Sequence, residues 1–226
     1  MQRRARKISL LSAGVLAALG LSLVHATAQA PNPLPPGHPL LGQPDTPGAK
    51  KLAPVAPPPI PTAADKLPLD KLKVPTGYKL EVFMAGVPNA RTLRLGDKGT
   101  VFVSSRLQDK VHAIVEKNGK RELKVVASGL HRPNGIALHK GTLYIAELSQ
   151  ISKIENVEDV LDNPPKPTVI LADLPKDEAH GWKTLTVGPD DKLYFQVGAP
   201  CNICMPSEKH AKIYRVGLDG KGMEVY

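Results

Sequence analysis

The sequence predicts an all-β protein with the fold of a β-propeller. Three segments share one pattern: an apolar alternating strand, a turn that contains Gly or Asp, and a second strand rich in β-branched and aromatic residues. The segments are residues 92–103, 135–146 and 185–197. Phe102, Tyr144 and Tyr194 take equivalent places in them, about 42 and then about 50 residues apart, and a repeat of this length is typical of propeller blades.

The outer strands of the three blades are predicted from shorter apolar runs. They fall at residues 111–115, 123–127, 151–154, 169–171 and 213–216. Residues 78–84 alternate apolar and charged side chains, which predicts a half-buried strand before the first blade. Residues 157–161 are expected to form a short helix.

Three blades do not close a ring, whereas a propeller removes its exposed edges by completing one, typically with four to eight blades. We therefore expect a fragment of a longer propeller. The alternative is a ring completed by a second copy of the chain.

The N-terminal region reads as a delivery segment followed by a linker. Residues 1–30 combine a basic start, an apolar run and the small residues Ala28-Gln29-Ala30, which predicts a secretory signal peptide; an uncleaved membrane anchor is the alternative. Residues 31–66 are rich in proline and are expected to be a disordered, extended linker, or a ligand for a polyproline-binding partner. Residues 67–226 would then form the partial propeller domain, and the protein would be periplasmic or secreted from a bacterium.

Composition argues against nucleic acid as a partner. The formal charge is +9, but four of the basic residues belong to the predicted signal. Aromatic residues make up 4% of the chain, too few for stacking platforms on single strands. Contact with a membrane is expected only through the export signal, and the oligomeric state is not predicted.

Residues that begin two of the inner strands are the best candidates for chemistry. A neutral imidazole suits a general base near pH 7, and His180 precedes the third inner strand; the alternative is a histidine that caps a strand end on a loop carbonyl. Gly181 would allow a flat cofactor to approach, or make a tight turn. Trp182, the only tryptophan, would wall the site or belong to the core between blades. Asn134 and Gly135 begin the second inner strand, where Asn134 is a site residue or a left-handed turn residue.

The two cysteines, Cys201 and Cys204, have the C-x-x-C spacing. Met205 follows where a c-type haem attachment requires histidine, and a zinc site would find only His210 as a third ligand. No metal ligand is therefore predicted. A small loop disulfide and two free thiols remain as interpretations.

Several motifs carry a resemblance to a known family. They are residues 87–91, 96–103, 132–135, 161–167, 180–183 and 197–204. Together they resemble the sorbosone dehydrogenase group of the glucose/sorbosone dehydrogenases, over roughly residues 70–226. These are exported six-bladed propellers that use pyrroloquinoline quinone (PQQ), with calcium, to oxidise sugars or aldehydes.

The resemblance implies that the chain is the N-terminal half of such a propeller, with about three of six blades. His180 would be the catalytic base while hydride passes to PQQ, and electrons would leave to a respiratory acceptor. Asn134, Gly135, Gly181 and Trp182 would lie near the cofactor. The substrate would be a sugar or a sugar-derived aldehyde.

The chain also departs from the family pattern. Soluble PQQ glucose dehydrogenases have an aspartate after the glycine that corresponds to Gly198, where this chain has Ala199. The family's arginine-asparagine pair, calcium ligands and cofactor-clamping arginines would lie beyond Tyr226. We therefore expect the base without the cofactor cradle. A metal-dependent lactonase propeller and a non-catalytic binding module remain as alternatives.

Overall fold

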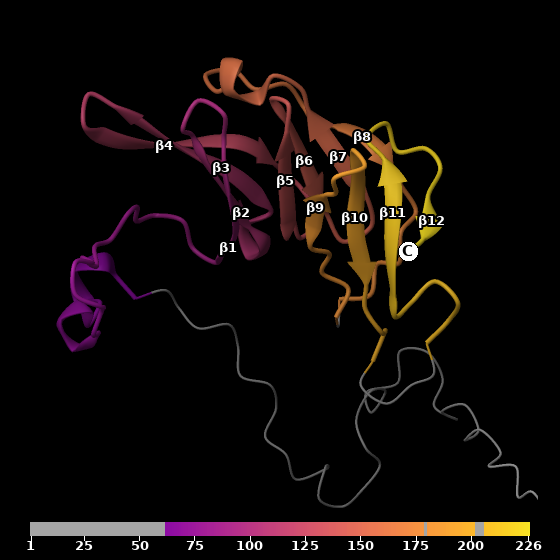
Figure 1. Ribbon diagram of the computed structural model, residues 1–226, viewed down its shortest axis with the longest axis horizontal. Helices are drawn as coiled ribbons and strands as arrows, with labels where there is room; N and C mark the ends of the chain where they lie inside the picture. Colours follow the sequence, from indigo (N-terminus) through magenta and orange to yellow (C-terminus); the bar gives the residue numbers. More distant parts are fainter. Residues whose placement is uncertain (1–61, 179, 202–205) are drawn as a thin grey trace, which may run out of the picture. The chain divides into compact units, whose positions relative to one another are not determined.

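The computed structural model describes residues 62–178, 180–201 and 206–226, and these residues fold mainly as β-strands. The chain divides into two units, residues 1–30 and 31–226, and all described residues belong to the second. They form three antiparallel four-stranded sheets (Figure 1). The all-β prediction is therefore confirmed. Within the described ranges, no helix has the length and apolar character needed to cross a membrane.

Each sheet is a meander whose strands pair in chain order, as in a propeller blade. The first sheet contains β1 (Ala90–Leu95), β2 (Val101–Ser105), β3 (Lys110–Lys117) and β4 (Lys120–Ser128). The second contains β5 (Gly135–His139), β6 (Thr142–Ala146), β7 (Ile151–Ile154) and β8 (Thr168–Leu171). The third contains β9 (Leu185–Val187), β10 (Lys192–Val197), β11 (Lys212–Gly217) and β12 (Glu224–Val225).

Two short 3₁₀ helices precede the first blade, and two more lie within the first and second blades. They are Ala64–Lys66, Leu69–Lys71, Arg106–Gln108 and Val157–Asp159. The last confirms the short helix predicted at residues 157–161. The predicted signal and most of the predicted linker lie outside the described residues, so the domain boundaries remain predictions.

Two apolar clusters hold the three blades together. The first contains Phe102 of β2 and Leu143 of β6, both fully buried, so it joins the first blade to the second. The second contains Tyr144 of β6 and Leu193 of β10, so it joins the second blade to the third. Since neighbouring residues of a strand point to opposite faces, each blade offers one face to the blade before it and one to the blade after it.

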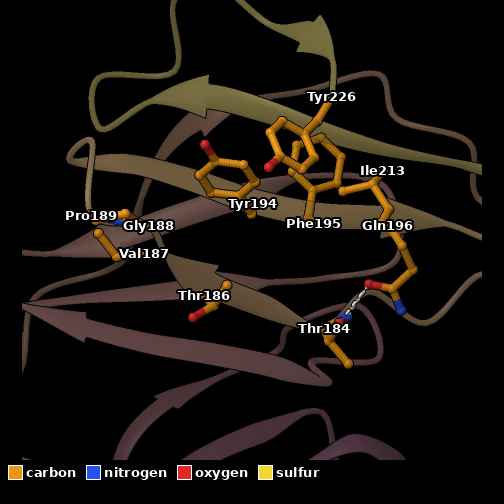
Figure 2. A pocket seen from close by; sticks show the side chains of 10 residues that line it. All are labelled: Thr184, Thr186, Val187, Gly188, Pro189, Tyr194, Phe195, Gln196, Ile213 and Tyr226. Atoms are coloured by element: carbon orange, nitrogen blue, oxygen red, sulfur yellow. Dashed lines mark hydrogen bonds between the residues drawn. The ribbon is translucent and has the colours of Figure 1, made fainter.

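Tyr194 is the third member of this series, and its face carries no further blade among the described residues. A hollow of about 680 Å³ on the third sheet is lined by Tyr194, Tyr226 and Ile213 among others, and Figure 2 shows the Tyr194 ring beside that of Tyr226. The hollow lies on the face that corresponds to those of Phe102 and Tyr144 in the first two blades. We therefore interpret it as an open inter-blade face and not as a built ligand site.

The strand predicted at residues 78–84 is wrong. These residues have no strand conformation, and Phe83 is 43% exposed. The segment is held instead by Arg121 of β4, whose guanidinium lies 4.0 Å from the centroid of the Phe83 ring and donates a hydrogen bond of 3.1 Å to the Phe83 carbonyl. Alternation alone does not make a strand, because a strand needs a partner for its backbone groups.

Candidate functional site

The residues that precede the three inner strands lie together, because β5 packs beside both β1 and β9. Asn134 connects them. Its side-chain oxygen accepts a hydrogen bond of 3.3 Å from Arg91 Nε on the first blade, and its amide nitrogen donates one of 3.1 Å to the Lys183 carbonyl before the third. Asn134 thus contacts the segment that contains His180.

Asn134 is buried, and both polar atoms of its amide are engaged in these bridges. It does not have the positive φ of a left-handed turn residue; the neighbouring Arg132 does, at 53°. The turn interpretation of Asn134 is therefore wrong. The amide orients Arg91 and joins three blades, and any effect on a ligand would act through those neighbours.

Gly135 and Gly181 face backbone and not an open site. A Cβ atom on Gly135 would lie 2.6 Å from the Leu185 nitrogen, and one on Gly181 would lie 1.7 Å from the Asp177 carbonyl oxygen. Both glycines are therefore required by the close approach of neighbouring chain segments. The direct cofactor contact predicted for them finds no support in their surroundings.

His180 stands exposed at the entry to β9, with a positive φ of 56°. Its Nδ1 lies 3.2 Å from the carbonyl oxygen of Ala199, in the loop after β10. A carbonyl oxygen only accepts hydrogen bonds, so Nδ1 carries the proton and Nε2 keeps its lone pair. The contact is the one expected of a capping histidine, and it also prepares Nε2 to act as a base.

Glycine at position 198 makes this contact possible. A Cβ on Gly198 would lie 2.1 Å from the His180 carbonyl oxygen. The absence of a side chain at Gly198 thus lets the backbone of His180 lie against the loop that carries Ala199.

Trp182 is not part of the core between blades, because 36% of its surface is exposed. The guanidinium carbon of Arg106, just after β2, lies 3.6 Å from the centroid of its ring. This stacking is a cation–π contact. Trp182 therefore forms an exposed aromatic wall, and a cation from the first blade, Arg106, lies over its ring.

Arg106 is the member of an arginine cluster that lies on this wall, and the other two members, Arg91 and Arg132, lie near Arg106. Burial lowers the pKa of Arg106 from its ordinary value, and the charges of Arg91 and Arg132 lower it further. The Nε atom of Arg106 is buried and has no hydrogen-bond partner among the described residues. Glu178 balances part of the charge, at 3.7 Å from Arg132. The cluster is thus positively charged and keeps an unused donor at Arg106 Nε.

The sequence did not reveal the arginine cluster. Its members are spread over three segments, and their association depends on how β1, β2 and β5 are packed. The sequence offered one clue to the cluster, which is that each arginine lies at or near an end of β1, β2 or β5. Lys183 was missed too: it is fully buried, and burial lowers the pKa of its ammonium to about 8.

The cysteine loop is described only in part. Cys201 is buried and is not a free thiol, whereas Cys204 lies outside the described residues. The predicted disulfide therefore remains a prediction. His210 binds Asp177 at 2.8 Å and Ser207 at 2.7 Å. Within the described ranges, no group of three His, Cys, Asp or Glu side chains is placed to hold a metal ion.

Comparison with known proteins supports the fold. No family model matches the sequence. An uncharacterized protein of Borreliella burgdorferi is 28% identical over 165 residues, which is 68% of this chain and 42% of the relative. The PQQ domain of pyranose dehydrogenase from Coprinopsis cinerea, in its holo form, superposes with a TM-score of 0.55 at 17% identity, over 65% of this chain and 38% of that one.

A carbohydrate-active enzyme of family AA12 from Trichoderma reesei, solved with iodide, superposes with a TM-score of 0.51 at 17% identity, over 64% of this chain and 39% of that one. The three sheets are blades of a β-propeller. The chain spans about two fifths of the length of these relatives. At such identities the likeness establishes the architecture, and the activity is a separate question.

Proposed function

We propose that the chain is part of an exported PQQ-dependent dehydrogenase that oxidises a sugar or a sugar-derived aldehyde of the sorbosone type. The observation that carries the proposal is the pairing of an exposed histidine, whose Nε2 is left as the acceptor, with a nearby arginine cluster in which Arg106 keeps an unused donor. The propeller likeness to a PQQ domain agrees with it.

The arginine cluster fits the anionic character of PQQ, which carries three carboxylates. Arginine binds carboxylates through paired N–H donors, and Arg106 has a buried Nε without a partner. We assign the carboxylates to Arg91, Arg106 and Arg132, and we assign a flanking apolar wall to Trp182. This assignment proposes cofactor-binding cations in this half of the propeller, in addition to the arginines that the family resemblance places beyond Tyr226.

PQQ, when bound, would supply a quinone carbon that accepts hydride from the substrate. The chain's own part is proton transfer: His180 Nε2 takes the hydroxyl proton of a sugar hemiacetal or a hydrated aldehyde as the carbonyl forms. The Ala199 carbonyl accepts the hydrogen bond from Nδ1–H and so leaves Nε2 as the atom that takes the substrate proton.

Other parts of the proposal lie beyond the described residues. Calcium is given no ligand here, because the described segments offer no group of three His, Cys, Asp or Glu side chains. A respiratory acceptor would receive the electrons, and the export signal would place the protein in the periplasm or outside the cell.

The binding of PQQ tests the proposal directly. Purified protein is titrated with PQQ in the presence of calcium, and the quinone absorbance is followed. We expect a saturable red shift. Arg106→Met keeps the apolar stem over Trp182 but removes the donors, so the dissociation constant should rise about 10- to 150-fold, as for the loss of a charged hydrogen bond worth about 1.5–3 kcal/mol.

Arg121→Met is the matched control, because Arg121 also stacks on an aromatic ring, that of Phe83, at 4.0 Å but on the outer strand β4. This variant should bind PQQ as the wild type does. Equal weakening by both substitutions would indicate a general charge effect. A folded wild-type protein that leaves the quinone spectrum unchanged would contradict the proposal and favour a binding module.

His180→Gln separates binding from chemistry. If His180 is the base, turnover of protein reconstituted with PQQ and calcium should fall about 10²- to 10⁴-fold, while the PQQ dissociation constant changes less than about threefold. Unchanged turnover would remove His180 from the mechanism.

A further inference from the structure

Lys183 is a fully buried cation whose ammonium is satisfied by backbone carbonyls. It donates to the carbonyl of Leu148, to that of Pro175 at 2.9 Å and to that of Gly181 at 3.0 Å. An ammonium has three donors, so all of them are used. A buried charge is costly, and one retained without an adjacent ion-pair partner among the described residues calls for a reason beyond packing.

The three acceptors come from three different segments. Leu148 follows β6, Pro175 follows β8, and Gly181 lies between His180 and Trp182. The ammonium therefore draws the segment that carries the candidate base against two loops of the second blade. Within the described residues, no other side chain between His180 and β9 forms a hydrogen bond to those loops.

The backbone of Lys183 extends the same link toward the arginines. Its carbonyl accepts the hydrogen bond from Asn134, which in turn accepts from Arg91. On its other side, Gln196 of β10 binds the backbone of both neighbours: it donates to the Trp182 carbonyl at 3.0 Å and accepts from the Thr184 amide at 2.9 Å. The side chain and the backbone of Lys183 thus join the base, the aromatic wall and the arginine cluster.

We infer that Lys183 is a positioning residue: by holding the Gly181 carbonyl against the loops after β6 and β8, its ammonium sets where His180 and Trp182 stand. The role of these two residues rests on the proposed function, whereas their placement by Lys183 does not. Lys183 itself contacts no substrate in this scheme.

The burial of Lys183 makes the hydrogen bonds of its ammonium sensitive to alkaline pH. Burial lowers the pKa of Lys183 to about 8, and the charge of Asp177 opposes the shift. Asp177 is itself paired with His210. Asp177 is partly exposed, and the buried carboxylate nearby is that of Glu147, beside Leu148, which accepts hydrogen bonds from the His131 amide and from Gln150.

A neutral amine keeps two N–H donors for three acceptors, and it loses the strength of a charged donor. The hold on Gly181 should therefore weaken as the pH rises through about 8.

Trp182 reports on its own position, because it is the only tryptophan of the chain. Its emission and its quenching by acrylamide are followed from pH 6 to pH 9.5 in protein without added cofactor. We expect an inflection near pH 8 in the wild type and its loss in Lys183→Met, which keeps the apolar stem. Lys140→Met is the control, since Lys140 is 72% exposed and pairs with Asp191 at the surface; it should keep the inflection.

Asp177→Asn provides a second test that does not alter Lys183. Removing the opposing charge should move the inflection to lower pH. An inflection that stays in folded Lys183→Met, or its absence from the wild type, would overturn the inference. Because these readings need no PQQ, a positive result with no PQQ binding would refute the proposed function alone, and PQQ binding without the inflection would refute the positioning role alone.

Discussion

The equivalence of Phe102 and Tyr194 yields a sharp prediction about stability. The two residues occupy the same place in the first and third blades, but only Phe102 lies under a following blade in the described structure. Phe102 is fully buried, so Phe102→Ala leaves a cavity between two sheets. Substitutions of this kind cost about 3–5 kcal/mol of the free energy of unfolding.

Tyr194 has weaker attachments. Its ring meets that of Tyr226 edge-on, with centroids 5.0 Å apart, and its hydroxyl donates to Asp190 at 2.9 Å. An aromatic pair contributes about 0.5–1.5 kcal/mol and a hydrogen bond a similar amount, less where water competes. Tyr194→Ala should therefore cost about 1–2 kcal/mol.

Urea unfolding followed by far-UV circular dichroism measures both variants. With a slope of about 2 kcal/mol per M, their midpoints should differ by about 1 M, provided that the slopes agree. Tyr144→Ala, at a site that is 4% exposed, should behave like Phe102→Ala. If Tyr194→Ala cost as much as Phe102→Ala, the reasoning would be refuted, because the third face would then be covered in solution; sedimentation velocity would show whether a second copy covers it.

Two further predictions follow from Lys183 and Gly181. The pKa of Lys183 is about 8 in the folded protein against an ordinary 10.5, so between these two pH values the unfolded chain binds more protons than the folded one. The free energy of unfolding should therefore be independent of this group below pH 8 and rise by about 2 kcal/mol from pH 8 to 9.5. A comparison of urea midpoints should show that this rise is absent in Lys183→Met. Gly181→Ala should lower the free energy of unfolding by about 1–3 kcal/mol or more and expose Trp182 to acrylamide, because the added Cβ would meet the Asp177 carbonyl. The control is Gly119→Ala, in open space at a left-handed turn, which should lower the free energy of unfolding by about 1 kcal/mol and leave the quenching of Trp182 unchanged. Equal quenching in the two glycine variants would contradict the packing argument.

The sequence by itself determined the strands of the blades. Four predicted segments match the observed strands end to end: β6 (Thr142–Ala146), β7 (Ile151–Ile154), β9 (Leu185–Val187) and β10 (Lys192–Val197). The period-two pattern and the Gly or Asp turns are local, and local signals suffice where each strand pairs with the next one along the chain. The prediction at residues 78–84 failed for the same reason: the alternating pattern is present there, but among the described residues no strand pairs with the segment.

Only the tertiary structure decided what surrounds His180. Its tautomer depends on the Ala199 carbonyl, and the arginine cluster depends on the packing of β1 and β5 beside each other. The exposure of Trp182 and the burial of Lys183, one residue apart, also follow from packing. Contacts between blades join residues tens of positions apart, and no local pattern encodes them. The sequence thus pointed to the histidine as a candidate, and the packing of the blades supplied the charges and the hydrogen bonds that surround it.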